Sequence, residues 1–127
     1  MFQIDPLSRI PVYEQIITQA ENMVIHSVLK PGDPLPSVRS LSVRLSINPN
    51  TIQKAYTELD RRGLLVSISG KGCFVRGDLA EFFFLKRARQ KKQFEDLVHT
   101  LKNGGMPLSL LEESLHQIYE EEEVQAI

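Results

Sequence analysis

The sequence predicts a mainly α-helical fold with one small β-hairpin: a winged helix-turn-helix over residues 1–77, followed by a two-helix C-terminal region over residues 78–127. Three observations lead to this fold class. Apolar residues recur at helical spacing in three segments before the hairpin. Two β-rich runs, 64–68 and 73–75, flank Ser69-Gly70-Lys71-Gly72, which is typical of a hairpin turn. Helical spacing then returns in two further segments.

The first helix is expected to start near Ser8 and Pro11. Ser8 can cap it, and Pro11 fits its first turn because the N–H that proline lacks would have no intrahelical partner there. One apolar face follows and consists of Tyr13, Ile16, Ile17, Ala20, Met23, Val24 and Val28. The segment 30–36 ends this helix, because three prolines in six residues cannot continue it.

A short helix, a tight turn and a longer helix come next. Ser37 is expected to cap the short helix, whose inward-facing residues are Val38, Leu41 and Leu45. Ser46-Ile47 forms the turn, and Asn48-Pro49 supplies a cap followed by proline in the first helical position. Gly63 is suited to end the longer helix in a left-handed conformation. The inner face of that helix is formed by Ile52, Ala55, Tyr56 and Leu59.

The last 50 residues predict two more helices. The first runs over about 79–102, and a capping box of Ser109 and Glu112 starts the second. Two amphipathic helices cannot bury both their faces against so small a winged helix, and the apolar cluster 82–85 needs cover. We therefore expect a dimerisation region that forms a homodimer through Phe82, Phe83, Leu97, Leu101, Leu111 and Leu115.

The formal net charge of −1 conceals a basic segment. Residues 1–77 carry nine Lys/Arg and six Asp/Glu, whereas residues 78–127 carry six and ten. Within the first part, residues 37–76 hold seven cationic side chains against only Glu58 and Asp60, a local charge of +5. Such a segment favours a polyanionic partner, so we expect this part of the chain to bind double-stranded DNA.

In a helix-turn-helix the second helix lies in the major groove, with its N-terminal residues toward the base edges. The outward-facing residues of this helix are Asn50, Thr51, Gln53, Lys54, Thr57 and Arg61. Asn and Gln side chains can bond adenine bidentately, and Pro49 or the Thr51 methyl group can touch a thymine methyl group. The alternative is an ordinary polar solvent face, and the basic surroundings favour DNA.

Arg39 and Arg44 lie on the short helix, which crosses the phosphate backbone in this motif. Arg39 is one turn from Ser37, so the side chain and the helix N-terminus can address one phosphate together. A surface salt bridge is the alternative, and for Arg44 both remain open. Gly70-Lys71-Gly72 lets the backbone come close and presents one cation, which suits a wing in the minor groove or against a phosphate.

Nothing in the sequence indicates catalysis, a metal or a cofactor. One cysteine, Cys73, excludes an internal disulfide, and we interpret it as a small apolar residue rather than a redox switch. His26, His99 and His116 fall on three helices without ligand spacing, and no catalytic set or phosphate-binding loop is present. No apolar run approaches the roughly 20 residues of a membrane span, and no signal pattern starts the chain, so we expect a cytoplasmic protein.

Five cations lie within the seven residues Lys86–Lys92. We interpret them as a solvated stretch of a long helix. Contact with flanking DNA, or with the acidic residues Glu120–Glu123 of a second subunit, are the alternatives.

Four groups of residues occur in order: Lys30-Pro31-Gly32-Asp33-x-Leu35-Pro36-Ser37-x-Arg39-x-Leu41, Asn48-Pro49-Asn50-Thr51-Ile52-x-x-Ala55-Tyr56-x-x-Leu59, Gly63-Leu64 and Gly70-Lys71-Gly72-x-Phe74-Val75. This series resembles the GntR family of bacterial transcription regulators. The resemblance implies homodimers on a palindromic operator, with DNA contacts from Arg39, Pro49, Asn50, Thr51, Gln53, Gly70 and Lys71. The C-terminal length is similar to that of the YtrA subfamily, whose two helices serve chiefly for dimerisation. Cys73 departs from the family, which commonly has threonine or serine there.

The leading hypothesis is a sequence-specific DNA-binding transcription regulator, a repressor, that acts as a homodimer. One alternative is a ligand-gated sensor with a small-molecule effector site between the C-terminal helices. The other is a winged-helix module that binds protein instead of DNA. The polar and basic outer face of residues 49–61 favours DNA, because a protein-binding module would show apolar residues there.

Overall fold

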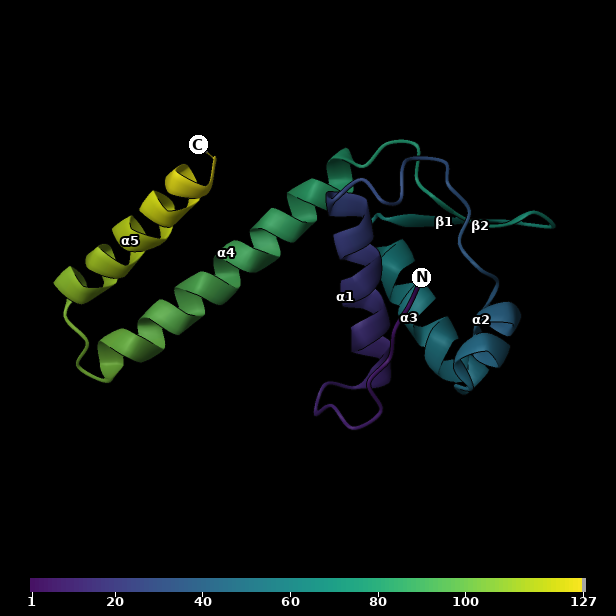
Figure 1. The fold of residues 1–127 in the computed structure, drawn as a ribbon, viewed down its shortest axis with the longest axis horizontal. Helices are drawn as coiled ribbons and strands as arrows, with labels where there is room; N and C mark the ends of the chain where they lie inside the picture. Colours follow the sequence, from purple (N-terminus) through teal and green to yellow (C-terminus); the bar gives the residue numbers. More distant parts are fainter. Residues whose placement is uncertain (127) are drawn as a thin grey trace. The chain divides into compact units, whose positions relative to one another are not determined.

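The computed structural model describes the backbone of residues 1–126 and the side chains of residues 1–121. Its elements are α1 (Val12–Ile25), α2 (Val38–Leu45), α3 (Pro49–Arg61), β1 (Leu65–Ile68), β2 (Gly72–Val75), α4 (Ala80–Asn103) and α5 (Leu108–Ala126) (Figure 1). This order confirms the predicted fold class. Packing divides the chain into two compact units, Met1–Lys86 and Arg87–Ile127, so that α4 begins in the first unit and continues into the second.

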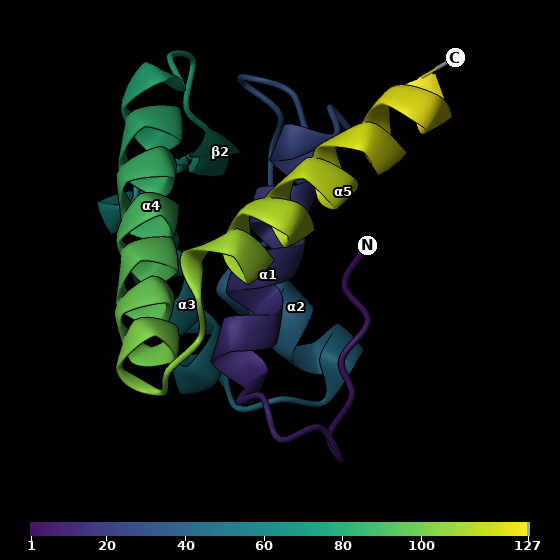
Figure 2. The same ribbon diagram turned by 90° about the vertical axis from the view of Figure 1, so that its left-hand side faces the viewer.

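The core of the first unit lies where α1 packs on α3. Figure 2 shows α1 near the middle of the view, with α3 partly hidden behind other helices. Leu41 of α2, Leu65 of β1 and Val75 of β2 close this core, and none is more than 1% exposed. The predicted inner face of α3 is therefore confirmed, that of α2 is confirmed with Val38 and Leu45 half-buried against the core, and that of α1 is confirmed as far as Val24. From α1 and α3 the core takes Ile16, Ile17, Ala20, Val24, Ile52, Ala55, Tyr56 and Leu59.

The ends of α1 differ from the prediction. Pro11 is the N-cap residue and no side chain caps the helix, whereas the Ser8 hydroxyl accepts a hydrogen bond from the backbone N–H of Ile10 at 3.1 Å. Ser8 therefore stabilises the turn before the helix. The helix ends at Ile25, which leaves Val28 outside its apolar face and 66% exposed. Two α1 glutamines, Gln15 and Gln19, hold the N-terminal segment by hydrogen bonds in both directions with the backbone of Asp5 and Gln3.

The wing, formed by β1, β2 and the turn between them, also pairs with the segment before α2, which the sequence pattern did not predict. β1 and β2 pair antiparallel, from Leu65 opposite Val75 to Ile68 opposite Gly72. On the other side of β2, the backbone N–H groups of Gly32 and Leu35 donate to the carbonyls of Val75 and Cys73, each at 2.9 Å. The proline-rich segment that ends α1 therefore also pairs with the outer edge of the hairpin.

The start of α4 is anchored in the first unit. Asp78 Oδ1 accepts from the backbone N–H of Ala80 at 2.9 Å, and the Phe82 side chain is completely buried in the core. Gly63 makes this approach possible, since its φ is +84° and a Cβ there would lie 3.2 Å from the backbone nitrogen of Phe82. The sequence predicts that a second subunit buries Phe82. In the structure, residues of the same chain bury it.

The second unit buries little apolar surface of its own. None of the described side chains of α5 is buried, and Leu97 and Leu115 are 57% and 41% exposed. Leu101 and Leu111 are half-buried. The predicted capping box is wrong, because α5 begins at Leu108, directly after Pro107, and Ser109 lies inside the first helical turn. Lys92 pairs with Asp96 at 3.4 Å, while the side chains of Glu122 and Glu123 fall outside the described residues.

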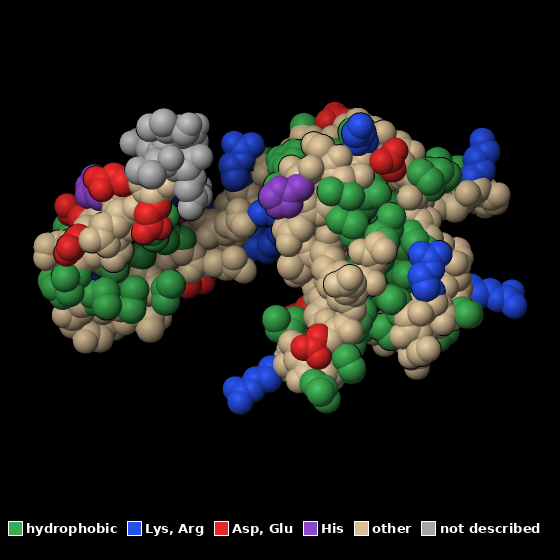
Figure 3. Space-filling view, viewed as in Figure 1, with side chains coloured by type: hydrophobic (Ala, Val, Ile, Leu, Met, Phe, Trp, Pro, Cys, Tyr) green, Lys and Arg blue, Asp and Glu red, His purple; other side chains and the backbone are tan. Residues whose placement is uncertain are grey.

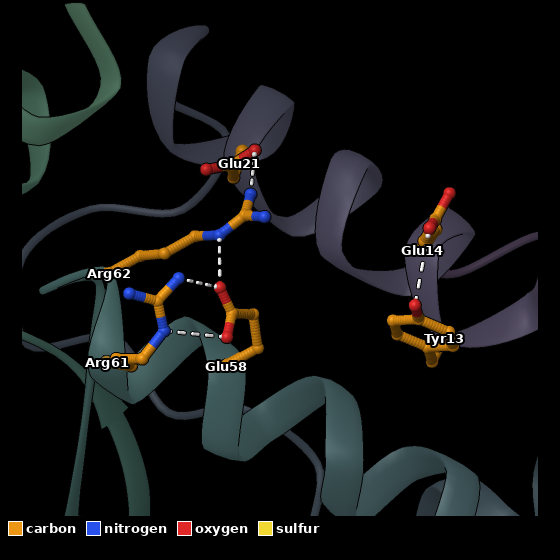
Figure 4. A network of polar contacts seen from close by, with 6 residues as sticks. All are labelled: Tyr13, Glu14, Glu21, Glu58, Arg61 and Arg62. Atoms are coloured by element: carbon orange, nitrogen blue, oxygen red, sulfur yellow. Dashed lines mark hydrogen bonds and ion pairs between the residues drawn. The ribbon is translucent and has the colours of Figure 1, made fainter. Parts of the chain in front are cut away.

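An ion-pair network fixes the C-terminal end of α3 to α1 (Figure 4). Glu58 accepts hydrogen bonds from Arg61 and Arg62, and Arg62 also reaches Glu21 of α1 at 3.2 Å. The hydrogen bond from Arg61, helped by that from Arg62, lowers the pKa of Glu58 from its ordinary value of 4.5 to about 2. Because the carboxylate is the better acceptor, this network favours the charged form of Glu58 in the folded protein.

Glu58→Gln is expected to lower the free energy of unfolding near neutral pH by about 1 kcal/mol, the scale of a partly exposed network. Since folding lowers the pKa of Glu58, its charge stabilises the fold fully above pH 4.5, and this is lost as the pH falls toward 2. Urea unfolding near neutral pH and at about pH 3 should show the difference from wild type shrink in acid. Glu14→Gln is the control, because Glu14 makes no ion pair among the described residues. An equal loss for E58Q at both pH values would contradict the prediction.

Candidate nucleic-acid interface

The turn between α2 and α3 is built by local hydrogen bonds. Ser37 caps α2 by accepting from the backbone N–H of Ser40 at 3.0 Å, as predicted. Ser46 adopts a left-handed conformation, with φ of 55°, and the Ser42 hydroxyl donates to the carbonyl of Ile47 at 2.6 Å. These contacts fix the angle at which α3 leaves the turn.

Tyr56 ties α3 back to the segment that enters α2. Its side chain is buried, and its hydroxyl donates to the carbonyl of Pro36 at 2.7 Å. Burial raises the pKa of Tyr56 well above its ordinary value, so the phenol keeps the proton that this hydrogen bond requires. The two helices of the motif are thus held together from both ends.

The predicted base-contacting residues lie together at the exposed start of α3. Asn48 caps the helix by accepting from the backbone N–H of Asn50 at 2.8 Å, and Pro49 occupies its first position. Pro49, Asn50 and Gln53 are exposed, and Thr51 is half-buried. The Gln53 side chain donates to the Thr57 hydroxyl at 3.2 Å. These groups leave donors and acceptors on the solvent side of α3.

Lys54 leaves this group and turns toward α1. Its Nζ lies 3.8 Å from the centre of the Tyr13 ring, in the first turn of α1. The sequence pattern does not indicate this contact, because the helical spacing of Tyr13 predicts only a place on the inner face of the first helix. Lys54 therefore occupies the flank of α3, beside its exposed start.

Ion pairing divides the cations of the basic segment into two sets. Arg61 and Arg62 pair with carboxylates of α3 and α1, and Arg76 pairs with Asp60 at 3.0 Å while its Nε donates to the carbonyl of Leu65 at 2.8 Å. These three arginines stabilise the fold. Of the seven cations in the described segment 37–76, the other four have no acidic partner: Arg39, Arg44, Lys54 and Lys71. Figure 3 shows Lys and Arg side chains that project on the side of the first unit where Figure 1 places α2 and the wing.

An open groove separates α3 from the wing. One wall carries Gln53, Thr57 and Arg61 of α3, and the other is the hairpin from Ser67 to Gly72. Its volume is about 680 Å³. Gly70 and Gly72 at its rim have φ of +75° and +115°, and nothing lies within 4 Å of where their Cβ atoms would be. The backbone at the wing tip is therefore accessible from the groove, and Lys71 lies between the two glycines.

Cys73 also lines this groove and is half-buried. Burial raises the pKa of the Cys73 thiol, which keeps it protonated and weakly reactive. Among the described residues, no group of three or more His, Cys, Asp or Glu side chains is arranged to hold a metal ion. None of the helices in the described part of the chain is long and apolar enough to cross a membrane.

Comparison with known proteins gives one family and several related chains. Residues 12–75 match the family described as "Bacterial regulatory proteins, gntR family". The chain is 38% identical to the HTH-type transcriptional repressor YtrA of Bacillus subtilis (strain 168) over 119 aligned residues. The aligned stretch covers 93% of this chain and 92% of YtrA. A transcriptional regulator from Oenococcus oeni has a similar fold, with a TM-score of 0.72 and 29% identity over 94% of this chain and 99% of the other. The AraR DNA-binding domain in complex with operator ORX1 matches with a TM-score of 0.51 and 31% identity, over 59% of this chain and 92% of that one.

Asn48→Ala is expected to lower the free energy of unfolding by about 1 kcal/mol, because it removes the cap of α3. Asn50→Ala is the matched control. The exposed Asn50 side chain has no hydrogen-bond partner in the described part of the chain, so its loss should change stability by less than about 0.5 kcal/mol. Urea unfolding of both variants measures the difference, and equal stabilities would contradict this separation of roles.

Proposed function

The chain belongs to the GntR family of bacterial transcription regulators, which are not enzymes, and we propose that it is a repressor that binds a palindromic DNA operator as a homodimer. The observation that carries the proposal is the start of α3, where Asn50 and Gln53 expose amide side chains and the same unit carries four cations without an acidic partner in segment 37–76. The operator complex of the AraR domain and the repressor name of YtrA support it. Such a regulator acts in the cytoplasm, where bacterial DNA lies.

In this proposal the start of α3 enters the major groove. Asn50 and Gln53 form hydrogen bonds with base edges, and adenine suits their amide groups best. Pro49 and the Thr51 methyl group supply apolar contact to thymine methyl groups. The Gln53–Thr57 hydrogen bond, at 3.2 Å, is exposed and easily exchanged for one to a base.

The cations without carboxylate partners bind the DNA backbone. Arg39 lies next to the capped N-terminus of α2, where backbone N–H groups also attract a phosphate. Arg44 lies at the end of the same helix, and Lys71 at the wing tip addresses a phosphate or the minor groove. The groove between α3 and the wing accommodates the DNA strand that runs between the major groove, which α3 enters, and the place where the wing contacts DNA. The bare backbone at Gly70 lets that strand come close.

The second unit supplies the dimer. Helices as poorly covered as α5 are marginal alone in water, so the exposed apolar side chains require a partner surface. The residues of the second unit available for it are Leu97, Leu101, Leu111 and Leu115. Phe83, in the part of α4 that belongs to the first unit, is also exposed and available, whereas Phe82 is occupied in the core of that unit. A two-fold homodimer presents two α3 helices, which suits a palindromic operator with half-sites about one helical turn, or a multiple of it, apart.

DNA titrations at several salt concentrations should show different effects for substitutions of the α3 residues and of the cations. Asn50→Ala or Gln53→Ala should cost about 1–3 kcal/mol on a duplex selected by the wild-type protein, and much less on a scrambled duplex. Arg39→Gln or Lys71→Gln should weaken both duplexes and lower the slope of log affinity against log salt by about one.

Arg61→Gln is the control for the cations, because Glu58 already neutralises Arg61 and its loss should change that slope less. An Asn50→Ala protein that loses affinity equally for both duplexes would contradict base contacts from α3. If no variant or wild-type protein binds DNA in a salt-dependent manner, the proposed function is wrong.

Leu97→Glu and Leu115→Glu should convert the dimer to a monomer, because each places a charge in the apolar surface of the second unit. Sedimentation measures the oligomeric state, and operator affinity should fall with it. His99→Glu is the control, since His99 is exposed on the same helix, about half a turn from Leu97. A wild-type protein that sediments as a monomer, or an unchanged dimer in both leucine variants, would contradict this interface.

A further inference from the structure

Lys54 is exposed on the flank of α3, and one contact restrains its side chain. Its ammonium group lies 3.8 Å from the centroid of the Tyr13 ring, well within the range of a cation–π contact. Tyr13 belongs to α1, which lies outside the helix-turn-helix motif itself. We propose that Tyr13 is a positioning residue for DNA binding, which holds the Lys54 ammonium ready for a DNA phosphate. This inference rests on the proposed function.

Lys54 contacts an uncharged aromatic ring, whereas the paired arginines contact carboxylates. Arg61 and Arg76 contact the carboxylates of Glu58 and Asp60, so their charge is neutralised within the protein. The face of a tyrosine ring attracts a cation without carrying a net charge. Lys54 is therefore held in place and still keeps its full positive charge for a phosphate.

This restraint matters because lysine is long and flexible. A free lysine side chain loses much of its rotamer freedom when it binds a phosphate. Contact with Tyr13 removes part of that freedom before DNA arrives, so less is lost on binding. An ammonium group has three N–H donors, and those that point away from the ring remain available to a phosphate oxygen.

The orientation of Tyr13 is set by α1 and not by Lys54. The Tyr13 ring is half-buried and packs against the core of the first unit. Its hydroxyl donates to Glu14 Oε1 at 3.3 Å, a contact drawn in Figure 4. Because the ring is fixed from its own side, it can act as a platform for a side chain of α3. The start of α1 thus becomes part of the DNA-binding surface.

The test is a double-mutant cycle with Tyr13→Leu and Lys54→Ala in the full-length chain, titrated against a fluorescein-labelled duplex that the wild-type protein selects from a random library. Tyr13→Leu should weaken binding about two- to fivefold, the size expected for an exposed cation–π contact. Its slope of log affinity against log salt should stay unchanged, because Lys54 keeps its charge. Lys54→Ala should lower that slope by about one. In the Lys54→Ala background, Tyr13→Leu should have no further effect.

Tyr13→Phe is the conservative control, since it keeps the ring and loses only the hydroxyl bond to Glu14. Its affinity should stay within about twofold of wild type. A Tyr13→Leu effect of equal size with and without Lys54 would show a merely structural role and overturn the proposal. Wild-type affinity in Lys54→Ala would also overturn it. If Arg39→Gln still lowers the salt slope in that case, the proposed function stands and only this inference fails.

Discussion

The packing of α1 against α3 is the constraint on which the rest of the structure depends. Two alanines, Ala20 and Ala55, are completely buried there, and large aliphatic residues such as Ile16 and Ile52 surround them. Each buried Ile or Leu side chain contributes roughly 1.5–3 kcal/mol, so this interface fixes the rotation of α3 about its axis. That rotation decides which residues remain outside, and it places Asn50 and Gln53 in solvent.

The same rotation brings polar groups of α3 to the flanks of the core. Tyr56 reaches the carbonyl of Pro36, Lys54 reaches the Tyr13 ring, and Glu58 joins the network with Arg62. The first contact ties α3 to the segment before α2, and the other two tie it to α1, the last through the Arg62–Glu21 pair. The helix is therefore held on two sides without using its outer face, and a rigidly held helix with a free face suits a binding site.

Features set by neighbouring residues could be predicted from the sequence. The caps Ser37 and Asn48 and the left-handed Gly63 depend on groups within about four residues, and the structure confirms all three. The bridge between segment 32–35 and β2 could not be predicted in this way, because it joins residues about forty positions apart in the chain. The capping box at Ser109 failed for a related reason, since the helix had already begun at Leu108, after Pro107.

The charge pattern of the sequence also predicts the site only in part, because it does not show which cations form ion pairs. A count of residues gives seven cations in the basic segment, but it cannot distinguish the arginines that the fold uses from those left for a ligand. Arg76 illustrates the difference, since its bonds to Asp60 and to the carbonyl of Leu65 join α3 to the wing. Only the three-dimensional pairing reduces the set to four cations without acidic partners.

On α3, the residues that define the fold and those that face the ligand alternate along one helix. Ile52, Ala55 and Leu59 are fixed by the core, whereas Asn50 and Gln53 make no contact with it. A change at either exposed position leaves the packing of α1 and α3 intact, so operator preference can change without loss of stability. Relatives such as YtrA, at 38% identity, can therefore differ from this chain at the exposed positions of α3 without disturbing the packing that defines the fold.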